Sequence, residues 1–400
     1  MPNEDLKLDL EGLHAKCRVH TADVEPMAMS QIYEFLNCPA FHGCDIRVMP
    51  DVHAGSGAVI GFTSKIGPGL CPNVVGVDIG CGVQTADLGR IDWSTKGRKR
   101  WFEWFDQMLR ASVPSGFNIR NNPYSKDRTR IIFKHFMSGA NVMGNPLDLF
   151  EKEVEAVANK IGTEFGKVWR AIGTLGGGNH FIEIDEDEDG HHWLTVHSGS
   201  RNFGLRVAEF HQHRAVAQMG KRGGLEWLEG SQADEYLHDM RVAQRFAMLN
   251  RLVMLDALTQ GLDLELKDLD IVTSVHNFIG DDDIIRKGAI SAKDGEMVVI
   301  PWNMRDGLVV GRGKGNPDWN FSAPHGSGRK MARGKAKREL DVEEFKSTMK
   351  DVWSSCVGRS TLDESPMAYK PTESIRDAIG DTVEIVKTMK PIYNFKAGGE

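Results

Sequence analysis

Five histidines lie beside Gly, Asn or Ser in short irregular stretches, a setting in which binding and catalytic side chains concentrate. Imidazole, thiolate and carboxylate groups together suit a borderline divalent metal ion, and glycine lets the backbone crowd around such a site. One such turn alone is usually structural, but their recurrence in one chain predicts a metal centre. The candidates are His53 in MPDVHAG, His180 in GGGNHF, His197 in VHSGSR, His276 in SVHNF, His325 in APHGSGR, and the pair Asp78 and Cys81 in VDIGCG.

Two of these turns also suit phosphate groups. The glycine run in TLGGGNH can point successive backbone N–H groups at an anion, although no GK[ST] follows it and it is not a P-loop. HGSGR ends in Arg329, whose guanidinium can make bidentate hydrogen bonds to a phosphate. The run RKMARGKAKR, residues 329–338, holds six cationic side chains. It is either a solvated helix face or a path for a polyanion, and its place directly after His325 favours the path. Together these features predict phosphoryl or nucleotidyl transfer.

The elements that must position these turns alternate along the chain. Short β-branched runs predict buried strands in the first ninety residues, and further strands are expected at FIEI, HWLTVH, DIVTSVHNF, GEMVVIPW, GLVVGRG and the tail PIYNFKAGGE. Helices are expected over 101–110, from 146 to near 173, and over 233–258, 342–353 and 373–389, whereas 115–130 predicts a loop. Because turns from both halves must converge, the pattern favours one α/β or α+β domain.

Composition narrows the class of protein. The 400 residues are 40% apolar and 26% charged, which excludes disordered and collagen-like chains. Six cysteines without CxxC spacing indicate a reducing compartment, and with no leader-like start and no apolar run of membrane-spanning length we expect a cytoplasmic protein with no membrane association. The net charge of -7 argues against strong non-specific binding to nucleic acid, yet the acidity gathers in clusters such as DEDEDG while cations gather after His325.

Taken in order, the motifs resemble one family. VDIGCG, LGGGNHFIEI, HSGSR, VHNF, RKGAISA, APHGSGR, PMAYK and KPIYNFK occur in the order found in RtcB-type RNA ligases, which act in tRNA splicing and RNA repair. The resemblance runs from about Met49 to Lys396. It implies an α+β fold in which one large RtcB-like domain, residues 1–400, has mixed sheets flanked by helices around a central metal and nucleotide cleft.

The resemblance also implies an activity. Such an enzyme uses GTP and manganese to join RNA ends bearing a 2',3'-cyclic phosphate or a 3'-phosphate to ends bearing a 5'-hydroxyl. His325 would attack GTP to give a covalent histidine–GMP intermediate, and Asp51 would orient its ring. The guanylyl group then passes to the RNA as a 3'-pp-5'-G end. The expected partners are RNA ends, from tRNA halves or from nuclease-damaged tRNA or rRNA, and an archease-like activator.

The family pattern further assigns ligands by position. Cys81 would bridge two manganese ions, with Asp78 and His180 on one and His197 and His276 on the other. Phosphate contacts to RNA would come from Arg201 and Arg329. The nucleotide would contact Asn179, His180, Phe181, Glu183, His276, Asn277, Asn303, Met304, Gly326, Ser327, Gly328 and Lys396.

One segment departs from the family pattern, and two rival functions remain. Where the family has a PGSMG turn followed by serine, this chain reads PWNMRDGL, and Leu308 cannot donate a hydrogen bond to a base. The main rival is a dinuclear metal-dependent phosphodiesterase or phosphatase that opens cyclic phosphates without ligation, for which His325 would not be a covalent acceptor. The second is a non-catalytic protein that binds RNA ends and would tolerate loss of Cys81.

Overall fold

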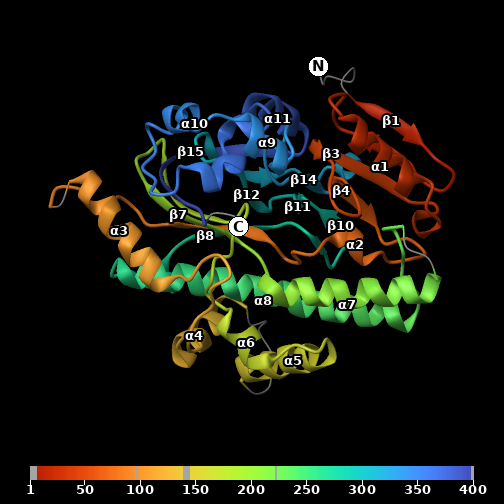
Figure 1. Cartoon of the computed structure of the whole chain (residues 1–400), viewed down its shortest axis with the longest axis horizontal. Helices are drawn as coiled ribbons and strands as arrows, with labels where there is room; N and C mark the ends of the chain where they lie inside the picture. The colour runs from red at the N-terminus through yellow and green to blue at the C-terminus, as the bar shows by residue number, and fades with distance from the viewer. Residues whose placement is uncertain (1–6, 96, 138–144, 221–222, 398–400) are drawn as a thin grey trace.

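The computed structural model describes residues 7–95, 97–137, 145–220 and 223–397 of the chain. Within them, helices and strands form an α+β arrangement with three sheets of six, seven and two strands. Figure 1 shows the long helices α7 (Arg201–Met219) and α8 (Ser231–Gly261) running below the sheets, with the short helices α9 (Arg333–Glu339), α10 (Val342–Thr348) and α11 (Thr372–Ala378) above them. Among the described helices, none combines the length and the apolar character that a membrane crossing requires.

The six-stranded sheet carries the first candidate turns. Its order is β1 (Leu8–Glu11), β2 (Lys16–Val19), β3 (Asp45–His53), β4 (Ile60–Lys65), β10 (Ile284–Lys287) and β9 (Phe278–Ile279). The β2–β3 pair is parallel and the others are antiparallel, so this sheet is mixed, as predicted. Helices α1 (Pro26–Leu36) and α2 (Pro72–Val75) pack beside it. Strand β3 ends at His53, so Asp51 lies two residues before the end of this strand.

The seven-stranded sheet is wholly antiparallel, which corrects the expectation of mixed sheets throughout. Its order is β12 (Met297–Asn303), β13 (Gly307–Gly313), β15 (Val383–Phe395), β6 (Phe181–Asp187), β7 (His192–Ser198), β5 (Gly82–Asp87) and β8 (Ile271–Val275). It curls until its edge strands β12 and β8 contact each other. The third sheet pairs β11 (Ala289–Ser291) with β14 (Ser322–Pro324), which leads directly into His325.

The remaining helices lie around α8, which packs against β5 and β7 and buries most of its length. They are α3 (Arg98–Ser112), α4 (Lys126–Phe136), α5 (Pro146–Lys160) and α6 (Phe165–Arg170). The largest apolar cluster, which includes Phe246, Leu252 and Leu255 of α8 together with Ile182 and Val196 of the sheet, fills the space between them. This layer fixes one side of the sheet, and the candidate turns emerge at its ends.

Several local predictions were wrong. Helix α11 ends at Ala378, and residues 383–395 form strand β15 instead of the rest of a helix over 373–389. The stretch is rich in β-branched residues, and pairing with β13 on one side and β6 on the other decides its conformation. The predicted helix from 146 to near 173 is two helices, α5 and α6, and α4 occupies part of the predicted loop over 115–130. Helix α7 was not predicted from the sequence.

Candidate metal and nucleotide site

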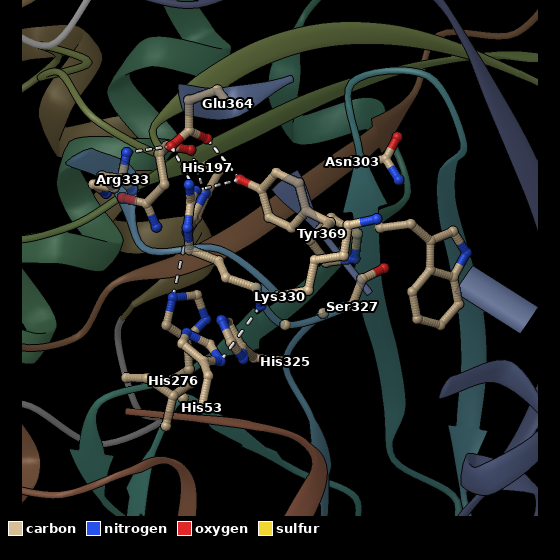
Figure 2. A pocket seen from close by; sticks show the side chains of 18 of the residues that line it. His53, His197, His276, Asn303, His325, Ser327, Lys330, Arg333, Glu364 and Tyr369 are labelled. Atoms are coloured by element: carbon tan, nitrogen blue, oxygen red, sulfur yellow. Dashed lines mark hydrogen bonds and ion pairs between the residues drawn. The ribbon is translucent and has the colours of Figure 1, made fainter. Parts of the chain in front are cut away.

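A cavity of about 750 Å³ lies where the turns of the three sheets meet. In Figure 2, His53, His276 and His325 lie together on one side of it, with Glu364, Arg333 and Tyr369 across from them. Of the residues predicted from the sequence, most line this cavity. His180 and Asp51 lie behind it, in contact with residues that do line it, and Arg201 lines a neighbouring cavity.

Two groups of metal-ligating atoms meet at Cys81. Cys81, His197 and His276 form one group, and Asp78, Cys81 and His180 form the other; within each, the candidate ligand atoms lie within 4.8 Å of one another. The Cys81 Sγ lies 3.5 Å from His180 Nε2 and 3.3 Å from His197 Nε2, and His197 Nε2 lies 3.3 Å from His276 Nε2. Atoms that crowd this closely in a buried position are suited to surround cations, with one sulfur common to both groups.

Backbone carbonyls set the direction of two of these imidazoles. His180 Nδ1 lies 2.8 Å from the Leu175 carbonyl, and His197 Nδ1 lies 3.1 Å from the Asn179 carbonyl. A carbonyl only accepts, so each Nδ1 carries a proton and donates it. That arrangement aims Nε2 of each ring at Cys81 as the ligating atom, as outer-sphere partners do for metal-bound histidines. The donor set therefore fits a metal ion on the geometry of this chain.

Polar side chains inside helix α8 hold the ligand turns in place. Asn250 accepts from the backbone N–H of Gly173 and Thr174 and donates to the carbonyl of Gly199. The fully buried Arg251 donates to the carbonyl of Gly80, next to Cys81, at 2.7 Å and to that of Ser198 at 2.8 Å. Neither side chain was among the site residues predicted from the sequence, which indicated only a helix over 233–258. The signal was a polar pair, Asn-Arg, inside an otherwise apolar run.

Two further features shape the Asp78 turn. Asn277, which adopts a left-handed conformation with φ 67°, donates to the carbonyl of Asp78, and its own carbonyl accepts from Gly80 N–H. Gly199 of HSGSR leaves room for the Asp78 carboxylate, which a Cβ at this position would displace. The VHN and HSGSR motifs thus position the DIGCG turn as well as supplying histidines.

Burial disfavours the protonated form of two imidazoles of the cluster. Burial, with a smaller contribution from neighbouring histidines, holds the pKa of His197 and of His276 well below the usual value. Burial would raise the pKa of Asp78, but the hydrogen bond and charge of His180 outweigh it and lower that pKa to about 2. Burial and the Asp78 carboxylate raise the pKa of the Cys81 thiol well above its ordinary value. Metal binding would therefore displace a proton from Cys81.

His325 stands beside the cluster but belongs to neither group. Its Nδ1 lies 2.8 Å from Oδ2 of the fully buried Asp51, and its ring centroid lies 4.8 Å from that of His276. The carboxylate accepts from Nδ1–H, so Nε2 keeps its lone pair. Asp51 sits close under the glycine turn: a Cβ on Gly328, which has φ 70°, would collide with its backbone.

A buried ionic network forms the wall of the cavity across from the histidines. Glu364 Oε2 accepts from Lys396 Nζ at 2.7 Å and from the Tyr369 hydroxyl at 2.7 Å, and Arg333 pairs with the other carboxylate oxygen. Arg329 also contacts Glu364, at 3.3 Å. The network joins the HGSGR turn, PMAYK and the chain's last strand. Glu364 was not predicted from the sequence, because nothing local marks a carboxylate that pairs with residues distant in the chain.

Glu364 is expected to make stability depend on pH in the acidic range. Burial alone would raise its pKa, but Lys396, Arg333 and Arg329 outweigh burial and lower the pKa from 4.5 to about 2. Stability from a depressed carboxyl pKa is present above the unfolded value and is lost as the pH falls through the folded one. We expect a loss of about 3 kcal/mol between roughly pH 5 and pH 2. Urea unfolding of wild type and Glu364→Gln across that range tests this, and equal slopes for the two would contradict it.

Glu183 and Asn394 both line the cavity. The buried Glu183 accepts from Asn394 Nδ2 at 2.7 Å. Burial raises the pKa of Glu183 to about 7, and burial plus the Glu183 charge raises that of Asp185 well above normal. Burial therefore disfavours the ionised form of Glu183, and in that form its two oxygens can accept hydrogen bonds from the N–H edge of a base. Lys396 lies over the Phe181 ring at 5.4 Å and donates to the Asn179 carbonyl, so the predicted nucleotide residues meet here.

The departing PWNMRDGL segment forms the tight β12–β13 connection. Asn303 and Met304 line the cavity, and the Asn303 side chain accepts from the backbone N–H of Arg305 and Asp306 while donating to the Asp306 carboxylate. Leu308 does not line the cavity: it is fully buried against Val83, Trp193 and Met389. The change at Leu308 is thus a core substitution in this fold.

Both predicted RNA-contacting arginines are engaged with the protein. Arg201 donates to the carbonyl of Gly116 at 2.6 Å and to Thr174 Oγ1 at 3.1 Å. Arg329 donates to the carbonyls of Asp363 and Met331 besides its contact with Glu364. Each lines a cavity, so contact with RNA phosphates stays a prediction for both.

Comparison with known proteins shows the family of the chain. The family model described as tRNA-splicing ligase RtcB matches residues 31–397. The chain is 28% identical to the RNA-splicing ligase RtcB of Escherichia coli K12, over 97% of this chain and 98% of that protein. It is 27% identical to the tRNA-splicing ligase RtcB of Archaeoglobus fulgidus, over 86% of each. The family model covers most of the chain, which therefore belongs to the RtcB family of RNA ligases.

Proposed function

We propose that this RNA ligase joins 2',3'-cyclic-phosphate or 3'-phosphate RNA ends to 5'-hydroxyl ends through a GMP-linked His325, within one catalytic domain over residues 1–400. The observation that carries the proposal is the His325–Asp51 pair. His325 Nδ1 lies 2.8 Å from the Asp51 carboxylate and donates its proton to it. The lone pair on Nε2 therefore stays available beside a cluster of metal-ligating atoms. A phosphodiesterase would need the cluster but no oriented nucleophile next to it.

The proposed ligation proceeds in three steps. His325 Nε2 attacks the α-phosphorus of GTP, so that a P–N bond forms, the bond to the β-phosphate oxygen breaks and pyrophosphate leaves. An oxygen of the RNA 3'-phosphate then attacks that phosphorus, the P–N bond breaks, and the RNA carries a 3'-pp-5'-G end. Finally the 5'-hydroxyl of the second RNA attacks the RNA phosphate and GMP leaves, with the hydroxyl proton going to solvent or a base. A 2',3'-cyclic phosphate is first opened by water to a 3'-phosphate.

The cluster fits two divalent ions, which we propose to be manganese. Asp78, Cys81 and His180 would hold one ion, and Cys81, His197 and His276 the other. Bound there, such ions would neutralise charge on the triphosphate and on the leaving pyrophosphate. The same donors also suit zinc, so the choice of metal rests on availability as well as on geometry.

The part of the cavity lined by Glu183 and Lys396 suits guanine. Glu183 offers carboxylate oxygens to the N–H groups at the base edge, and Lys396 can donate to a carbonyl oxygen such as O6. Both line the cavity together with Phe181 and Asn303. Lys396 is paired with Glu364, so GTP would have to share or replace that ion pair.

The proposal is tested with α-labelled GTP and manganese, followed by denaturing electrophoresis, with and without an archease-type activator. We expect acid-labile label on the protein, and little transfer from labelled ATP. Metal binding without protein labelling would instead favour the phosphodiesterase. Ligation of a 5'-hydroxyl RNA to a 3'-phosphate RNA, measured over a range of salt, should weaken as salt rises because phosphate contacts release counterions.

Replacing Asp51 with asparagine tests its role in orienting His325. An amide can present its N–H₂ group to Nδ1 and favour the tautomer that protonates Nε2, which removes the attacking lone pair. We expect guanylylation to slow by about 100- to 10,000-fold, by analogy with carboxylates that orient catalytic histidines. Metal content should not change, because Asp51 belongs to neither metal group. A variant that labels at the wild-type rate would show that Asp51 has only a structural role.

A further inference from the structure

A second cavity adjoins the nucleotide cavity. It measures about 1130 Å³ and shares Asn179, Arg333 and Lys396 with the nucleotide cavity. Five cationic side chains and a single carboxylate, Asp363, line it. The carboxylate is paired with Arg333 at 2.9 Å and with Lys337 at 3.6 Å. The cations are Arg110, Arg201, Arg333, Lys337 and Lys396.

An aromatic side chain stands at the rim of this second cavity. Phe117 is 85% exposed, the highest fraction among the exposed large hydrophobic side chains in the described part of the chain. It lines the cavity, but no hydrogen bond or ring contact accounts for its position among the described residues. Single exposed apolar side chains are common on protein surfaces, so exposure alone does not single out Phe117. Its place at a cationic cavity does, because there the ring offers a flat apolar face to an occupant.

The loop that carries Phe117 is fixed to the ligand turns. The Gly116 N–H donates to the Gly176 carbonyl at 2.9 Å, and the Gly116 carbonyl accepts from Arg201 at 2.6 Å. On either side, the Leu175 N–H donates to the Pro114 carbonyl and Arg120 donates to the carbonyls of Ser112 and Gly173. The loop therefore does not depend on the Phe117 side chain for its conformation, and the ring is held out at a fixed place.

We propose that Phe117 is a stacking platform for an unpaired nucleobase of the RNA strand whose end enters the site. Single-stranded nucleic acid is held by cationic grooves combined with aromatic faces, which is the combination found here. Arg333 and Lys337 belong to the basic segment after His325, so part of that segment faces this path. The continuity of the two cavities directs the strand toward His325. This inference rests on the proposed function for its substrate, and it adds a preference for ends that are not base-paired.

Binding of short RNAs with 2-aminopurine next to the terminal nucleotide tests the proposal without requiring catalysis. One RNA carries the probe beside a 3'-phosphate and the other beside a 5'-hydroxyl. Wild-type protein should quench the fluorescence of at least one of them. Phe117→Ala should weaken that binding about 10- to 100-fold and remove the quenching, and Phe117→Trp should restore both. Wild-type protein should bind a blunt duplex with the same end more weakly than the single strand. Phe117→Ala should bind the duplex and the single strand with equal affinity.

The matched control is Leu13→Ala, which removes a side chain of similar exposure, 82%, outside both cavities. It should bind RNA as wild type does. Equal affinity and equal quenching for wild type and Phe117→Ala would overturn the proposal, as would failure of Phe117→Trp to restore binding in a variant that unfolds at the wild-type temperature. Absence of guanylylation in wild type would instead count against the proposed function and would leave this binding test intact.

Discussion

A His325→Ala variant is expected to lose covalent guanylylation and RNA ligation, by about 10,000-fold or more, while keeping its metal. Removing a nucleophile eliminates the step that depends on it, and losses of this order are typical. Metal content should survive because His325 belongs to neither group of ligating atoms. The measurements are label retained from α-labelled GTP after denaturation, and metal per chain by elemental analysis.

The outcome separates two roles for the same ring. If the variant loses label and metal together, His325 is a ligand and not a nucleophile. His213→Ala is the matched control, because His213 is an exposed histidine of α7 that lines neither cavity. It should label at the wild-type rate.

A Cys81→Ala variant is expected to lose both metal ions and all ligase activity. Its sulfur is the one atom common to the two ligand groups, so its removal opens both at once. Loss of an outer-sphere partner already weakens metal binding by about 10- to 100-fold, and loss of a shared ligand should exceed that. Metal per chain and affinity for manganese, measured by titration calorimetry, provide the test.

Two companion variants sharpen this test. His180→Ala should disturb only the group with Asp78, so one ion should remain. Cys44→Ala, a cysteine outside both groups, should bind metal as wild type does. Retention of two tightly bound ions by Cys81→Ala would show that the sulfur is not a ligand. Thermal unfolding of each variant distinguishes loss of a ligand from loss of the fold.

Prediction from the sequence alone was most successful for features that depend on residue type and on neighbouring residues. Histidines in glycine-bounded turns, Asp78 with Cys81, and the HGSGR turn predicted a metal centre and phosphate chemistry, and the ordered motifs indicated the family that the comparison now shows. The helix α8 was also predicted well and matches the expected segment within a few residues. These features are local, so they can be read from neighbouring residues.

Only the tertiary structure decided how distant residues pair. Strand β15 replaced a predicted helix because β6 and β13 complete its hydrogen bonds, and Leu308 proved to be a core residue because the sheet curls over it. The Glu364–Lys396 ion pair, and the way Arg251 holds the Cys81 turn, join segments far apart in the chain. Sequence determines which groups are present and their local periodicity. Burial and long-range contacts, which depend on the whole fold, determine which atom of each group is free to act.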